Sequence, residues 1–93
     1  MLPSMEPDDD RPFLLKWSRT FPDNLKAQDF TGRLASDPTM FARIYFQDSH
    51  PDENVRWYWT VSASAQIASG HAADATAAAR AAEEAYTTWK AVH

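Results

Sequence analysis

Two neighbouring segments in the middle of the chain alternate apolar and polar residues, and this alternation constrains the fold more than any other feature. Residues 40–47 read MFARIYFQ and residues 56–62 read RWYWTVS. A period of two places successive side chains on opposite faces of a strand, so each segment is expected to form a half-buried β-strand. The polar stretch between them contains a proline and is expected to form the hairpin loop.

The two strands are expected to share one apolar face. On it lie Met40, Ala42, Ile44 and Phe46 from the first strand and Val55, Trp57, Trp59 and Val61 from the second. Pairing Phe46 with Val55 sets the register and places Ile44 opposite Trp57, Ala42 opposite Trp59 and Met40 opposite Val61. A small residue opposite a large one fills space evenly, so Ala42 and Trp59 favour this register.

Weaker strand signals come before this pair. Residues 13–17 alternate and predict a first strand, and residues 29–31 predict a short one. Gly32 is interpreted as a turn or bulge, after which residues 33–35 continue the strand. Residues 64–73 contain the second glycine, Gly70, and are predicted to form a loop.

The alanine-rich residues 74–92 predict one long helix. Asp74 is a suitable N-cap, and the apolar residues that follow recur every three or four positions, which produces a single apolar stripe. Glu83 and Glu84 are expected on the exposed side. The fold class is therefore α+β, an antiparallel β-meander of three to four strands with one C-terminal helix packed on one face, in two layers. Residues 1–11 predict a disordered acidic tail, and residues 12–93 a single domain.

Part of this pattern resembles a group of small bacterial proteins of unknown function. The resemblance runs from Asp29 to Val92 and rests on Phe30, the triplet Arg43-Ile44-Tyr45, the pair Trp57-x-Trp59, then Gly70-x-Ala72 and an Ala/Glu-rich helix. Ala42 stands where glycine is more usual in that pattern. The resemblance implies a β-meander with a C-terminal helix and implies no activity.

The sheet face away from the helix is the candidate binding surface. It is expected to carry Arg43, Tyr45, Arg56 and Tyr58, with Lys16 joining from the first strand. Basic side chains among aromatic ones suit a protein partner or self-association as a homodimer. Nucleic acid is the alternative, since bases stack on rings while Arg meets phosphate, as in an antitoxin-like or phage-related regulator. The plain interpretation is a solvated face stabilised by Arg–Tyr pairs.

The residues of known catalytic and metal sites are missing or wrongly spaced. The chain has no cysteine and two glycines, which excludes disulfides, thiolate sites and a glycine-rich phosphate loop. The acidic hairpin loop around His50 lacks the spacing of a calcium loop. We therefore expect a non-catalytic binding or accessory protein with no cofactor and no metal. A net charge of −4 argues mildly against nucleic acid, and no leader or membrane span is predicted, so the cytoplasm is the expected location.

Overall fold

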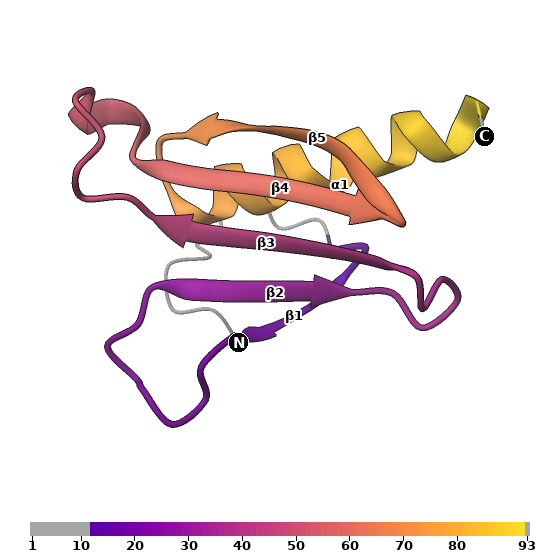
Figure 1. Ribbon diagram of the computed structural model, residues 1–93, viewed down its shortest axis with the longest axis horizontal. Helices are drawn as coiled ribbons and strands as arrows, with labels where there is room; N and C mark the ends of the chain where they lie inside the picture. Colours follow the sequence, from indigo (N-terminus) through magenta and orange to yellow (C-terminus); the bar gives the residue numbers. More distant parts are fainter. Residues whose placement is uncertain (1–11, 93) are drawn as a thin grey trace.

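In the part of the chain that the structure describes, five antiparallel strands follow one another across a single sheet in the order of the sequence (Figure 1). The computed structural model describes residues 12–92, so the predicted tail, residues 1–11, lies outside the described residues. The strands are β1 (Lys16–Arg19), β2 (Asp29–Arg33), β3 (Met40–Phe46), β4 (Trp57–Ala63) and β5 (Ala65–Ala72), and the helix α1 (Ala75–Val92) packs against β3, β4 and β5. The predicted α+β class with two layers is confirmed, with five strands in place of three to four.

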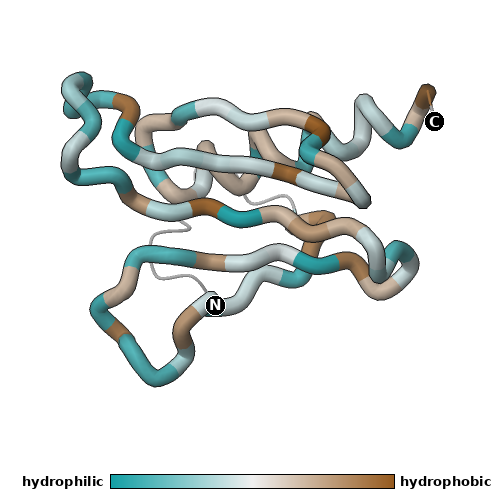
Figure 2. The backbone as a smooth tube through the Cα atoms, viewed as in Figure 1, coloured by the Kyte–Doolittle hydropathy of each residue, from teal (hydrophilic) through white to brown (hydrophobic). Residues whose placement is uncertain are grey.

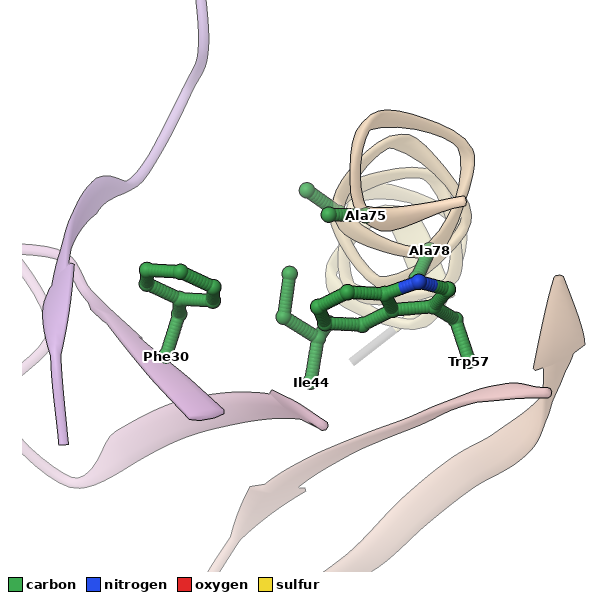
Figure 3. Close-up of a cluster of buried hydrophobic side chains, with 6 residues drawn as sticks. Phe30, Ile44, Trp57, Ala75 and Ala78 are labelled. Carbon is green, nitrogen blue, oxygen red and sulfur yellow. The ribbon is translucent and has the colours of Figure 1, made fainter. Parts of the chain in front are cut away.

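The core lies between the sheet and α1, on the face that the alternation predicts. Met40, Ala42, Ile44 and Val61 are fully buried there. Figure 3 shows side chains from three neighbouring strands, Phe30, Ile44 and Trp57, on the side of the sheet that faces Ala75 and Ala78 of α1. By contrast, the loop between β3 and β4 is mostly hydrophilic (Figure 2).

Alanine lets α1 approach the sheet closely. The helix buries Ala75, Ala78, Ala79 and Ala82 completely, and these residues have no side chain beyond Cβ to hold the helix away. Its N-terminus is capped as predicted: the Ala77 N–H donates to Asp74 Oδ1 at 2.8 Å.

Each of the two glycines lies opposite a tryptophan on the neighbouring strand. Gly32 pairs with Trp17, and Gly70 pairs with Trp59. A Cβ atom at either glycine would lie 2.9 Å from the nearest ring atom, so each indole ring occupies the space of the missing side chain. The prediction of a turn or bulge at Gly32 is therefore wrong. This glycine continues β2 in register, and neither glycine has a positive φ.

The predicted register between β3 and β4 is wrong by two residues. The observed pairs are Phe46–Trp57, Ile44–Trp59, Ala42–Val61 and Met40–Ala63. A 3₁₀ turn, η1 (Glu53–Val55), causes the shift because it takes Val55 out of the strand. The Asn54 N–H donates to the Asp52 side chain at 3.0 Å and fixes this turn. A shift of two residues keeps every side chain on its predicted face, since the period of a strand is two.

The predicted loop at residues 64–73 is wrong, because this stretch forms β5. Its sequence, AQIASGHA, consists mostly of small residues with weak strand propensity. The pairing with β4 stabilises the strand conformation that the low propensity of these residues does not favour. Trp59 covers Gly70, and Ser64 forms the tight turn between the two strands with a φ of 69°. The register shifts at Val61/Ser62, which marks a β-bulge.

Glu83 is buried, and its predicted exposure is wrong. Its Oε2 atom accepts two hydrogen bonds, from the Leu15 N–H at 3.0 Å and from the Trp17 Nε1–H at 2.9 Å. The Arg80 guanidinium lies 3.8 Å from the other carboxylate oxygen. The bond from Leu15 to the helix also explains why β1 begins at Lys16 and not at residue 13 as predicted.

We expect Gly32→Ala and Gly70→Ala each to lower the free energy of unfolding by about 1–3 kcal/mol, because the new methyl group overlaps an indole ring. Ser69→Ala, beside Gly70 but exposed, is the control and should stay within about 0.5 kcal/mol of wild type. Urea-induced unfolding followed by tryptophan fluorescence measures both. Glycine variants as stable as the control would show that the rings move aside freely.

We expect Glu83→Ala to lower the free energy of unfolding by about 2–4 kcal/mol, because the buried Leu15 N–H loses its acceptor and Arg80 loses its counterion. Glu84→Ala removes the same group at the adjacent exposed position and should stay within about 0.5 kcal/mol of wild type. Equal effects of the two substitutions in urea-induced unfolding would contradict this role of Glu83.

Candidate binding face of the sheet

The face of the sheet opposite α1 carries side chains in rows that cross the strands. Residues paired in register stand side by side, so each row has at most one member from each strand. One row, near the loop between β3 and β4, contains Asp29, Tyr45, Tyr58 and His71. The next row contains Ser18, Thr31, Arg43, Thr60 and Ser69. The first row carries rings, whereas the second is mostly hydroxyl groups.

Three rings from neighbouring strands form what we call the aromatic row: Tyr45, Tyr58 and His71. The ring centroids of Tyr45 and Tyr58 are 5.3 Å apart, and those of Tyr58 and His71 are 5.2 Å apart in a T-shaped contact. His50 extends the row from the hairpin loop, with its ring centroid 4.5 Å from that of His71. Tilted and edge-to-face contacts hold these rings in fixed orientations while leaving them partly exposed.

Hydrogen bonds orient the two histidines. His71 Nε2 lies 2.9 Å from Gln47 Oε1, and because the amide oxygen can only accept, Nε2 carries the proton. His50 Nδ1 lies 3.1 Å from the Asp52 backbone nitrogen, whose N–H donates to it. The loop and Gln47 therefore orient the two imidazoles through hydrogen bonds, in addition to the contact between their rings.

Arg43 neutralises a buried carboxylate. Its Nε and Nη2 atoms donate to the two oxygens of Asp29 at 3.0 and 2.5 Å, a bidentate ion pair. Asp29 is only 7% exposed, and its hydrogen bonds raise the pKa of the Arg43 guanidinium. The same guanidinium lies 4.8 Å from the centroid of Tyr45. Arg43 is thus a structural support for the aromatic row.

The other two basic residues predicted for this surface lie apart from the row. Arg56 Nε donates to the His50 carbonyl at 3.0 Å and anchors the hairpin loop. The register predicted from the pair Phe46–Val55 would place Arg56 opposite Tyr45, but in the observed register Tyr45 faces Tyr58 and Arg43 faces Thr60. Lys16 is exposed on β1 opposite Arg33.

Lys16 and Arg33 form a separate basic corner of the same face. The guanidinium of Arg33 lies 5.7 Å from the ring centroid of Phe41, which is 39% exposed. Of the five predicted site residues, the structure thus brings together Arg43, Tyr45 and Tyr58. Arg56 borders them at the loop, and Lys16 lies at the basic corner.

The sequence interpretation missed three members of this site: Asp29, His50 and His71. The sequence contains no signal for His71, because residues 64–73 are predicted to form a loop, and only the pairing of β5 with β4 places His71 beside Tyr58. His50 joins through the conformation of the hairpin loop, which no pattern in the sequence specifies. Asp29 is recognisable as a partner of Arg43 only once the register of β2 and β3 is known.

Comparisons with protein-family models, curated proteins and solved structures find no match to this chain, so the resemblance to small bacterial proteins stays a prediction. Within residues 12–92, no group of three or more His, Asp or Glu side chains is arranged to hold a metal ion. In the same residues, no helix has the length and apolar character needed to cross a membrane.

We expect Arg43→Ala to lower the free energy of unfolding by about 1–3 kcal/mol, because it leaves the Asp29 carboxylate buried without its counterion. The value is below that of a fully buried pair because the Arg43 side chain is 40% exposed. Arg33→Ala, which removes an exposed arginine from the same face, should change stability by less than about 0.5 kcal/mol. Urea-induced unfolding compares the two, and an Arg43 variant as stable as the Arg33 variant would contradict this role.

Proposed function

We propose that this protein is a non-catalytic binding protein whose open sheet face docks an extended, acidic segment of a partner protein. The observation that carries the proposal is the aromatic row, in which Tyr45, Tyr58 and His71 stand on three neighbouring strands with their rings partly exposed. Tyrosine and arginine are the residues on which protein interfaces most depend, because they combine large contact areas with polar groups.

The distribution of charge on this face supports an acidic partner segment. Arg43 is matched by Asp29, and Arg56 donates to the His50 carbonyl. The basic corner, Lys16 and Arg33, is therefore where this face carries exposed positive charge. Phe41, beside Arg33, is four residues from Tyr45 along β3, a distance of about 13 Å. A partner segment that places an aromatic or apolar residue on the aromatic row and an acidic residue about four positions away would match both sites.

Single-stranded nucleic acid is the second candidate, favoured by the stacking surface of the aromatic row. The charges speak against it, because Asp29 neutralises Arg43, and the loop beside the row carries Asp48, Asp52 and Glu53. Phosphate binding depends on basic side chains free to replace counterions.

Selection of displayed peptides tests the proposal. A random peptide library is selected on the wild-type protein, and the affinities of enriched peptides are measured for wild type, Tyr58→Ala and Phe21→Ala. We expect enriched sequences with an aromatic and an acidic residue about four positions apart. Tyr58→Ala should weaken them at least about tenfold, the effect of losing an interface tyrosine. Phe21, 49% exposed in the loop before β2, is the matched aromatic control and should have no effect.

Enriched peptides that bind Tyr58→Ala as tightly as wild type would contradict the proposal. In parallel, an oligothymidine and an oligouridine are titrated at low salt while amide chemical shifts are followed. Shifts at Tyr45, Tyr58 and His71 that disappear as salt rises, without peptide binding, would establish the nucleic-acid alternative instead.

A further inference from the structure

The two edges of the sheet differ in length and charge. β1 is four residues long and carries Lys16 and Arg19, and such short, charged strands discourage pairing with other chains. β5 is eight residues long and contains no charged residue and no proline. Figure 1 shows no strand beyond it on its outer side. Within residues 12–92, this edge lacks the usual protections apart from the bulge near its start.

Backbone groups of β5 point outward at two known positions. The Gln47 N–H donates to the Arg56 carbonyl, which makes Gln47 and Arg56 a hydrogen-bonded pair. From this pair onward, hydrogen-bonded and non-hydrogen-bonded pairs alternate along β3 and β4. By this alternation, the backbone N–H and C=O groups of Trp59 point toward β5, where Trp59 pairs with Gly70. The N–H and C=O groups of Ser69 and His71 therefore point away from β4, toward the open edge.

An apolar groove runs beside this edge on the helix side of the sheet. It lies between β5 and α1 and includes Trp59, Ile67, Ala85, Trp89 and Val92, with Glu84 and Thr88 as the polar residues of its lining. Val92 is 76% exposed. The large side chains stand toward the C-terminal end of α1. The exposed Ala73 and Ala77 stand at its N-terminal end, so the surface is bulky at one end and small at the other.

We propose that β5 pairs with β5 of a second copy of this chain, antiparallel about a two-fold axis near Gly70, to form one continuous sheet. Ser69 of each copy then exchanges backbone hydrogen bonds with His71 of the other. Gly70 meets its own symmetry mate at a non-hydrogen-bonded position, where chains approach within about 4.5 Å and a missing side chain helps.

A second copy fits this edge for two reasons. A strand without charges can face itself with no like-charge repulsion, whereas strands that select other partners commonly use charge. The two-fold axis also places the bulky end of each groove, with Ile67 and Trp89, against the small end of the other copy, with Ala73 and Ala77. A stable dimer buries about 800 Å² per partner, more than one strand edge provides, and the groove supplies the rest.

The helices of the two copies would lie on the same side of the joined sheet. Because α1 packs against β3, β4 and β5, its axis runs near β4, so the two axes would be about 14 Å apart. Directly packed helices are about 8–10 Å apart. The difference leaves space that large side chains such as Trp89 can fill. This pairing goes beyond the proposed function and leaves the aromatic row accessible.

Sedimentation equilibrium of the full chain tests the pairing with two variants that act by different means. Ser69→Pro removes a backbone N–H that points toward the open edge and does not take part in the pairing of β5 with β4. Ala77→Arg places a charge on the exposed N-terminal end of α1, where the proposed dimer brings Ile67 and Trp89 of the other copy. Thr87→Arg, an equally exposed position on the other side of α1, is the matched control, and circular dichroism confirms that each variant is folded.

We expect the wild type and Thr87→Arg to dimerise with the same dissociation constant. Ser69→Pro and Ala77→Arg should each raise it at least about tenfold. A wild type that stays monomeric up to about 1 mM would overturn the proposal. So would a dimer that both Ser69→Pro and Ala77→Arg leave unchanged, since that dimer would use another surface.

Discussion

The close approach of an alanine helix to a sheet that carries tryptophans is the constraint on which the rest of this structure depends. The approach is possible because Trp17 and Trp59 each lie across a glycine of the neighbouring strand, where each indole ring fills the space of the missing side chain. The helix meets this surface through alanines that are completely buried. The glycines, tryptophans and alanines therefore depend on one another, because a larger residue in place of a glycine or a buried alanine would separate the layers.

Polar contacts then fix the helix at the end of the sheet where β1 and β3 begin. Glu83 binds Leu15 and the indole of Trp17, which holds the start of β1 against α1. On the next turn of the helix, the Tyr86 hydroxyl donates to Asp37 at 2.6 Å and ties down the turn before β3. That bond lowers the pKa of Asp37 and raises the pKa of Tyr86 to about 12. Apolar packing is non-directional, so these hydrogen bonds determine the position of the helix along the sheet.

The sequence predicts those parts of the fold that hydrophobic periodicity encodes. β3, β4 and α1 have strong periods, and every side chain of the β3–β4 pair was placed on its observed face. The register depended on Val55, whose place in η1 is decided by a local hydrogen bond to Asp52 that the pattern does not contain. β5 was missed because its residues are small, and its strand conformation comes from β4. The candidate site was predicted in part for the same reason: Tyr45 and Tyr58 follow from alternation, whereas His71 requires β5.

The open face differs from an ordinary solvated sheet surface in how its side chains are distributed. The row through Thr31 and Thr60 has the small hydroxyl groups that suit a face in contact with water. One row away, the sheet exposes the rings of Tyr45, Tyr58 and His71, with Arg43 packed against the first of them. These rings are not needed to fill the core, because α1 covers only the other face. A chain that restricts its rings to one row, and supports them with the partly buried Asp29–Arg43 ion pair, keeps a fixed apolar surface where folding alone requires none.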